Sequence, residues 1–143
     1  MANHSRSGAI AVVMALLSSG ATNTHAQTAR PSARMAAEQW VKLVDEGHAD
    51  ESSRQAAAAF KSVRPIGAWS FTVERLRHVL GPLTSRTFKS STSTDELPTG
   101  QRGKFVVVRF DSVFERQLGT TFETIATVQE ADGQWRVIWY DVK

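Results

Sequence analysis

The apolar residues of this chain change their spacing at Leu83 from a helical period to a period of two. Before that position they recur three and four places apart, which is typical of amphipathic helices, and after it they alternate with polar residues, which is typical of strands. A chain that separates its helices from its strands in this way folds as an α+β domain. We therefore expect three N-terminal helices packed on a four-stranded antiparallel sheet.

The three helices are bounded by recognisable caps and stops. The first is expected over about 33–46, with Ser32 as its cap and Gly47 as its stop. The second is expected over about 51–62, with Asp50 as its cap and Pro65 beyond its end. The third is expected over about 68–80 and ends before Gly81.

The four strands are expected over 84–94, 103–110, 121–130 and 134–142. The dipeptide Asp132-Gly133 joins the last two, and this is the strongest short-range signal for a β-hairpin. Trp40 and Trp69 fall on the apolar stripes of the first and third helices, so both are expected in the core.

The hairpin turn predicts the register of the last two strands, with Val128 opposite Val137 and Ile125 opposite Tyr140. Alternation then divides the side chains between two faces. The more apolar face, which we expect to pack against the helices, carries Phe122, Ala126, Val128, Trp135, Val137 and Trp139. The mixed face, which we expect to form the wall of a shallow pocket or a partner surface, carries Glu123, Ile125, Thr127, Gln129, Arg136, Ile138, Tyr140 and Val142.

Residues 1–26 have the pattern of a secretory signal peptide. Arg6 stands without an acidic neighbour, residues 9–17 are apolar, and Thr24-His25-Ala26 offers the small residues that a signal peptidase reads. Cleavage is expected between Ala26 and Gln27, with a periplasmic or secreted mature protein. Residues 27–34 are expected to be a disordered lead, and residues 35–143 a single α+β domain.

The composition excludes several classes of protein. The chain has no cysteine, so it has no disulfide framework and no thiol catalysis. Its 17 Lys and Arg against 14 Asp and Glu form no basic stripe interleaved with aromatic residues, so we expect no nucleic-acid partner. No apolar run reaches 18 residues, so no membrane span is expected. The expected partner is a protein or a small ligand, and the oligomeric state is left open.

Motifs for catalysis and for metal binding are missing. The sequence contains no Gly-x-Ser-x-Gly and no His-Glu-x-x-His, and only His48 and His78 remain after removal of the signal segment. Two histidines cannot form a three-histidine zinc site. We therefore assign no catalytic residue, no metal and no cofactor.

Glu123 is the residue that most needs explanation, because it interrupts a strongly β-prone run where a lone charge would be desolvated. We expect a structural polar network in which Arg77 or Arg86 pairs with Glu123. A second interpretation places Glu123, Arg136 and Tyr140 in a ligand-binding site. A third makes Glu123 the general base of a small enzyme.

Two functions follow from these alternatives. We favour a non-enzymatic binding or interaction module, and the alternative is a small pocket enzyme, isomerase-like or cyclase-like, that uses Glu123 as its base. A closed apolar cavity of a few hundred Å³ beside Glu123 would favour the enzyme. A carboxylate saturated by arginine, with no cavity, would favour the module.

Short motifs from residue 36 to the end of the chain carry a resemblance to a known family. They are Trp40 with Val44-Asp45, Ser52 with Ala56-Ala57, Trp69, Arg77 with Leu80-Gly81, Ser85-Arg86, Leu97-Pro98, Val106-Val107-Val108, Phe122-Glu123-Thr124, Asp132-Gly133-Gln134-Trp135-Arg136-Val137 and Tyr140. In this order the motifs resemble a bacterial exported family, the domain of unknown function numbered 4019. The resemblance implies export and an α+β fold similar to the cystatin-like or nuclear-transport-factor-2-like sheets, and it implies no reaction.

Overall fold

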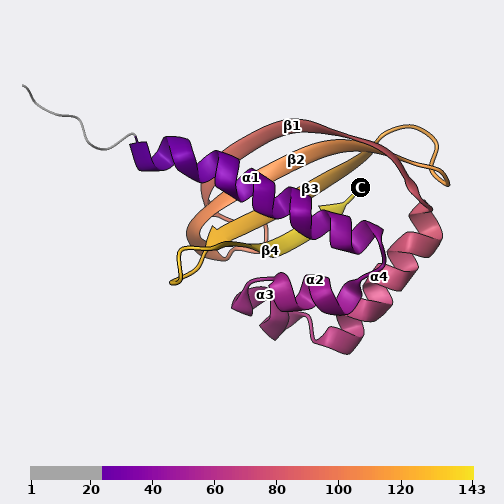
Figure 1. Cartoon of the computed structure of the whole chain (residues 1–143), viewed down its shortest axis with the longest axis horizontal. Helices are drawn as coiled ribbons and strands as arrows, with labels where there is room; N and C mark the ends of the chain where they lie inside the picture. Colours follow the sequence, from indigo (N-terminus) through magenta and orange to yellow (C-terminus); the bar gives the residue numbers. More distant parts are fainter. Residues whose placement is uncertain (1–23) are drawn as a thin grey trace, which may run out of the picture.

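Four helices precede four strands in the part of the chain that the computed structural model describes, residues 24–143 (Figure 1). The helices are α1 (Thr24–Asp45), α2 (Ala49–Gln55), α3 (Ala58–Val63) and α4 (Ile66–Leu80). The strands are β1 (Leu83–Glu96), β2 (Arg102–Phe114), β3 (Thr121–Gln129) and β4 (Trp135–Val142). The expected α+β class and four-stranded antiparallel sheet are confirmed, with one helix more than expected.

Each strand of the sheet pairs with the next along the chain, in the order β1-β2-β3-β4. In Figure 1, α1 lies across one face of this sheet, where it contacts all four strands. α3 packs against β4, and α2 packs between α1 and α4. The helices thus cover one face, the helical face, and we call the other the open face.

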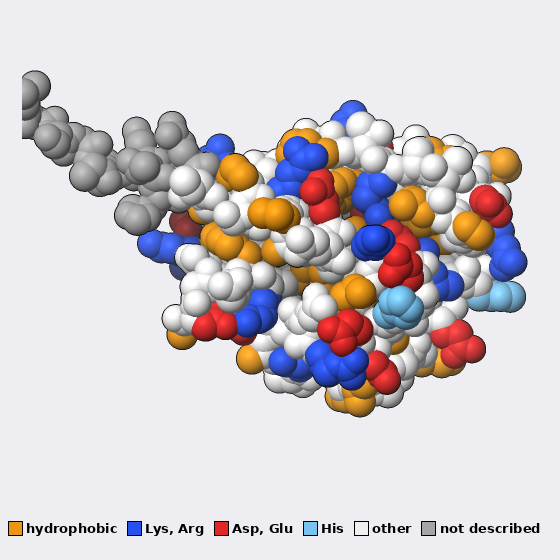
Figure 2. All heavy atoms as spheres, in the orientation of Figure 1, with side chains coloured by type: hydrophobic (Ala, Val, Ile, Leu, Met, Phe, Trp, Pro, Cys, Tyr) orange, Lys and Arg blue, Asp and Glu red, His pale blue; other side chains and the backbone are white. Residues whose placement is uncertain are grey.

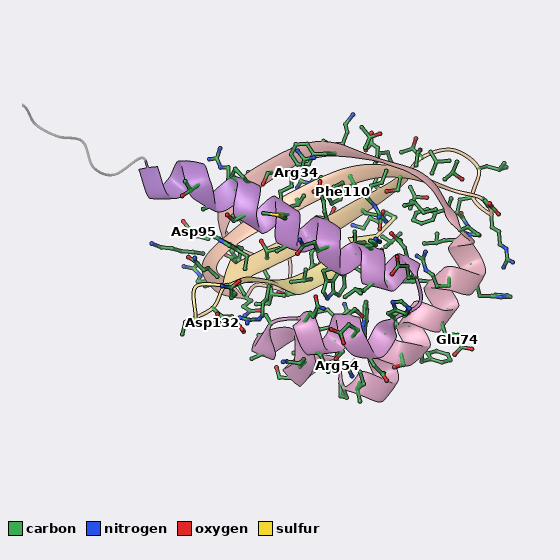
Figure 3. All side chains as sticks on the ribbon, viewed as in Figure 1. Arg34, Arg54, Glu74, Asp95, Phe110 and Asp132 are labelled. Carbon is green, nitrogen blue, oxygen red and sulfur yellow. The ribbon has the colours of Figure 1, made fainter. Side chains whose placement is uncertain are left out.

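α1 begins at Thr24, so the expected cap at Ser32 is wrong and residues 27–34 belong to a helix rather than to a disordered lead. The Ser32 hydroxyl donates to the carbonyl of Thr28 one turn earlier, as it does inside a helix. Packing against the sheet explains the extension, because Ala33 is fully buried and the Arg34 guanidinium lies 3.7 Å from the centre of the Phe88 ring. Figure 3 labels Arg34 close to the crossing of α1 over β1 and β2.

The expected second helix is interrupted, and its cap at Asp50 is also wrong because α2 begins at Ala49, two residues earlier than expected, with His48 at the cap position. The backbone of Ala56 and Ala57 is extended, and this extended link separates α2 from α3. The Ala57 N–H donates to the Val137 carbonyl of β4 at 2.8 Å. A hydrogen bond to the sheet therefore overrides the helix propensity of the four consecutive alanines.

Four aromatic rings meet between the helices and the sheet. Trp40 stacks on Trp69 with ring centres 5.5 Å apart, and the rings of Phe60 and Tyr140 contact both tryptophans edge to face. Each of these two indole N–H groups donates at 2.8 Å to the buried Ser52, from Trp40 to its carbonyl and from Trp69 to its hydroxyl. The expected core positions of Trp40 and Trp69 are confirmed.

The register of the β3–β4 hairpin agrees with the expected pairing over one half only. Ile125 lies opposite Tyr140 as expected, but Val128 pairs with Arg136 instead of Val137. Next to the turn, the Glu130 N–H donates to the Gln134 carbonyl at 3.0 Å, so the loop has three residues instead of two and the pairing is shifted by one. A β-bulge between Ala126 and Thr127, where β4 contributes one extra residue, restores the expected pairing beyond it.

The assignment of the two sheet faces was wrong for most residues. Glu123, Ile125 and Tyr140, expected on an exposed mixed face, lie buried under the helices. Phe122 and Trp139, expected under the helices, lie on the open face, where Phe122 is 58% exposed. The cause is that the polar groups under the helices satisfy one another. The one-residue shift at the beginning of β4 leaves Trp135 and Val137 under the helices, as expected.

Acidic and basic side chains alternate over the helical face, with apolar ones scattered among them (Figure 2). Two of the ion pairs lie within single helices, Arg34–Glu38 at 2.7 Å and Arg54–Glu51 at 2.6 Å. Exposed pairs of this kind contribute little to stability. Within residues 24–143, no helix has the length and apolar character needed to cross a membrane.

Candidate functional site

The carboxylate of Glu123 lies fully buried near the beginning of β3, where it accepts hydrogen bonds from side chains of the three other strands. Arg86 of β1 donates to Oε1 through Nε at 2.9 Å and through Nη2 at 2.7 Å. Ser112 of β2 donates to the same oxygen, and the Tyr140 hydroxyl of β4 donates to Oε2 at 2.7 Å. Both carboxylate oxygens therefore have donors, as a buried charge requires.

Arg86 extends this network to the end of α1. Its Nη1 lies 2.6 Å from Oδ2 of Asp45, and its Nη2 also donates to Oδ1 at 3.1 Å. Burial alone would lower the pKa of Arg86, but the hydrogen bonds to Asp45 and the charge of Glu123 outweigh burial and raise it. The guanidinium is therefore permanently charged, and it fastens α1 to the sheet through two carboxylates.

Tyr140 is held in its neutral form by the same carboxylate. The hydroxyl is buried, and burial together with the negative charge of Glu123 raises the pKa of Tyr140 well above its ordinary value of 10. The phenol is therefore a donor to Glu123. The sequence-based alternative of an exposed tyrosine on a recognition surface is wrong, because Tyr140 is only 5% exposed.

Arg77, the other expected partner of Glu123, does not contact it. Its Nη1 lies 3.4 Å from Oδ1 of Asp45, and its guanidinium lies 5.4 Å from the centre of the Phe114 ring. Nε and Nη2 of Arg77 are buried and have no hydrogen-bond partner within residues 24–143. Arg77 thus supports Asp45 and not Glu123, and the network contains two arginines and two carboxylates.

Arg136, expected as a possible ligand contact beside Tyr140, instead closes the β3–β4 hairpin. Its guanidinium contacts Glu130 at 2.9 Å and Asp132 at 2.6 Å. Hydrogen bonds from Arg136 and from the backbone lower the pKa of Asp132 to about 2. Figure 3 shows Asp132 at the same end of the sheet as Asp95, where both hairpins turn. The bulge in β4 separates Arg136 from Tyr140, so the expected binding pair does not form.

The buried network leaves little room for chemistry on Glu123. The residue lines none of five surface hollows that the described residues 24–143 form. A general base must reach a substrate proton with a free lone pair, directly or through one water. The oxygens of Glu123 are instead occupied by Arg86, Ser112 and Tyr140. Ser112 was missed from the sequence, although it continues the buried alternation of Val106, Val108 and Phe110 along β2.

A second region of interest lies on the open face of the sheet. A groove of about 710 Å³, the open-face groove, runs between β2–β4 and the segment 92–100, which turns back over the sheet. Its apolar lining includes Val107, Phe122 and Trp139 from the sheet and Leu97 and Pro98 from the turning segment. The expected pocket wall was on the opposite face, so the sequence placed the pocket on the wrong side.

The turning segment is anchored by its own small core. Leu97 is only 3% exposed and packs with Phe105, Ala126 and Ile138. Its backbone N–H donates to the Gln101 carbonyl at 2.9 Å. The wall of the open-face groove is therefore a packed part of the fold, and the groove exists without a ligand to shape it.

The fold and its buried network define an α+β domain in which helices fastened by ion pairs cover one face of a four-stranded meander. The chain belongs to the family described as "Protein of unknown function (DUF4019)", whose sequence model matches residues 36–140. The resemblance to the family numbered 4019 is thereby confirmed. A comparison with curated proteins gives no match.

Proposed function

We propose that this chain is an exported, non-enzymatic binding module that holds a small ligand in the open-face groove. The observation that carries the proposal is the apolar lining of this groove on the sheet face without helices, where Phe122 is 58% exposed. An apolar surface left open in a folded domain is the usual sign of a binding site. Its volume of about 710 Å³ suits a ligand of small-molecule size.

The alternative enzyme, with Glu123 as general base, receives no support from the surroundings of that residue. The carboxylate is fully buried and both of its oxygens accept hydrogen bonds, from Arg86 and Ser112 on one side and from Tyr140 on the other, which is the arrangement expected for a module. A substrate would have to displace these donors and pay their desolvation before reaching the carboxylate. Glu123 therefore acts on stability, by holding α1 and the four strands together.

The composition of the groove also favours binding over catalysis. Aromatic side chains bury much apolar area with little loss of conformational freedom, and the groove contains both the aromatic rings of Phe122 and Trp139 and hydroxyl groups. Those hydroxyl groups belong to Thr92, which pairs with Val107, and to Thr124, which pairs with Arg109. Hydroxyls beside aromatic rings orient a ligand by hydrogen bonds while the rings supply most of the affinity.

The export half of the proposal rests on the sequence of residues 1–26. The predicted cleavage between Ala26 and Gln27 falls three residues inside α1, and residues 1–23 lie outside the described part of the chain. Removal of residues 1–26 would leave α1 from Gln27 to Asp45, with the contacts of Ala33 and Arg34 intact. Export is thus compatible with the fold.

A fluorescence titration with N-phenyl-1-naphthylamine, a neutral apolar dye, tests the proposed site. We expect saturable binding at one site per chain, weakened about tenfold or more by Phe122→Ser because the ring supplies exposed apolar area in the groove. The matched control is Phe71→Ser, which removes a ring that is at least as exposed (65%) from α4, outside the groove. Equal loss in both variants, or no saturable binding, would contradict the proposal.

A further inference from the structure

We propose that the open-face groove selects a small amphipathic acid, a molecule with one anionic group on an apolar body, and that Arg109 recognises the anionic group. This inference rests on the proposed function, because it names the ligand class of the same groove. It goes beyond that function by assigning one specificity-determining residue. The argument depends on the position of Arg109, on the pairing of its neighbours and on the apolar surface around it.

Arg109 occupies the middle of β2 on the open face. It pairs with Ser90 of β1 on one side and with Thr124 of β3 on the other, and it lines the groove. The side chain is exposed, and within residues 24–143 it makes no hydrogen bond, ion pair or ring contact. A guanidinium whose N–H groups are all free can form a bidentate ion pair with a carboxylate or a sulfonate.

The other charged side chains that line the groove are neutralised within the protein. Glu96 pairs with Arg102, which lies outside the groove, at 3.6 Å, and the two lining residues Lys143 and Asp141 pair with each other at 3.3 Å. Next to the groove, Lys89 and Asp111 form a third pair at 3.2 Å. Arg109 therefore contributes one unbalanced positive charge, and an anion that enters the groove does not have to compete with a carboxylate of this chain for that arginine.

Apolar groups lie directly beside this charge. Val107 precedes Arg109 by two residues on the same face of β2, and Phe122 is its diagonal neighbour on β3 because Thr124 is its direct partner. A ligand that pairs its anionic group with Arg109 thus places the rest of the molecule on Val107, Phe122 and Trp139. Partial exclusion of water by this apolar surface strengthens the pair relative to one in open solvent.

The size of the groove favours a small molecule over a peptide or a second copy of the chain. Its volume of about 710 Å³ lies within the range of small-molecule sites. The segment 92–100 stands over part of the open face, and its Leu97 is buried in its own small core. A flat partner surface could not reach the groove floor past this segment without displacing Leu97.

Two dyes with the same aromatic skeleton test the inference. N-phenyl-1-naphthylamine is neutral, and 8-anilinonaphthalene-1-sulfonate carries one negative charge, so the ratio of their dissociation constants reports the recognition of the anion alone. We expect the sulfonate to bind about tenfold more tightly in the wild type. Arg109→Gln should bring the ratio close to one. The matched control is Arg75→Gln, which removes an unpaired exposed arginine on α4 and should leave the ratio unchanged.

The outcomes separate this inference from the proposed function. Neutral-dye binding that depends on Phe122, with no preference for the sulfonate or with a preference that survives Arg109→Gln, leaves the binding module in place and overturns the acid selectivity. If neither dye binds, both the binding module and its selectivity for an acid are overturned. Sedimentation velocity is run on the same samples, and a dimer that Phe122→Ser dissociates would assign the groove to a second copy of the chain and overturn the inference.

Discussion

The substitution Glu123→Gln tests the buried network that fastens α1 to the sheet. Glutamine has nearly the shape of glutamate, so the packing is kept while the charge is lost. In the wild type, Oε1 accepts from Arg86 and Ser112, and Oε2 accepts from Tyr140. An amide can accept through its oxygen only, so one of these two sets of donors must face an N–H group instead.

The magnitude follows from the charges that remain. Arg77, Arg86, Asp45 and Glu123 balance in the wild type, and Glu123→Gln leaves one buried positive charge uncompensated. Removing one partner of a buried pair costs about 3–5 kcal/mol. Arg86 keeps its two contacts with Asp45, at 2.6 and 3.1 Å, so the lower end of this range applies and we expect a loss of about 3 kcal/mol. For a domain of this size the melting temperature should fall by roughly 12 °C.

Thermal unfolding followed by circular dichroism measures this effect, and urea unfolding with an unchanged m value confirms that the two proteins expose the same surface. The control is Glu51→Gln, the same substitution in an exposed pair with Arg54, which should leave the melting temperature unchanged. If Glu123→Gln has the same melting temperature as the wild type, the network does not stabilise the fold. A functional role for that carboxylate would then have to be reconsidered.

Three further predictions concern pH, the turn into the sheet and export. Burial and the charge of Glu123 raise the pKa of Tyr140, the one tyrosine of the chain, so the free energy of unfolding should fall as pH rises above about 10, where the tyrosine ionises only in the unfolded state. Phenolate absorbance at 295 nm should then appear together with the loss of ellipticity, and phenolate formation near pH 10 in a folded protein would contradict this. Gly81→Ala should destabilise the domain by about 1–3 kcal/mol, because φ is +71° there and a Cβ would lie 2.8 Å from Cγ of Arg116. Gly67→Ala, in open space on α4, should be neutral or stabilising in the same denaturation assay, and an equal effect of both changes would refute the argument. Export should yield a mature chain that begins at residue 27, and N-terminal sequencing that finds residue 1 in the cytoplasmic fraction would exclude it.

Much of the architecture could be predicted from the sequence, because it depends on local patterns. The change of period at Leu83 separates the helical half from the strands, and Asp132-Gly133 marks the last hairpin. The pair Ile125–Tyr140 agrees with the prediction because the bulge between Ala126 and Thr127 offsets the one-residue shift next to the turn. The break between α2 and α3 could not be predicted, because the Ala57 N–H is satisfied by Val137, which lies 80 positions further along the chain.

The two faces of the sheet were assigned wrongly because the assignment used hydrophobicity alone, which does not show that buried polar groups can pair with one another. The face with Glu123 and Tyr140 contains polar groups, but those groups pair with Arg86 and Ser112 when they are buried together. Counting apolar residues treats each polar group as if it stayed unpaired. The bulge in β4 also places the beginning and the end of this strand in different registers, and no short-range signal in the sequence marks that bulge.

The partners of Glu123 could likewise be predicted only in part, because they depend on contacts between residues far apart in the sequence. The need for a buried cation beside this residue could be predicted from its position in a β-prone run, but not the choice between Arg86 and Arg77. Arg86 pairs across β1 and β2 with Ser112, which places it on the helical face next to Glu123. Arg77 lies near the end of α4, and its reach depends on the path of the chain through Gly81.

The most direct test of the central claim is a nuclear magnetic resonance titration of the ¹⁵N-labelled domain with 8-anilinonaphthalene-1-sulfonate. If the open-face groove is the binding site, the largest shifts should fall on the backbone amides of residues 107–109, 122–124 and 139–141, which lie on three adjacent strands. Shifts concentrated on α4 around Phe71, or under the helices around Glu123, would contradict the account.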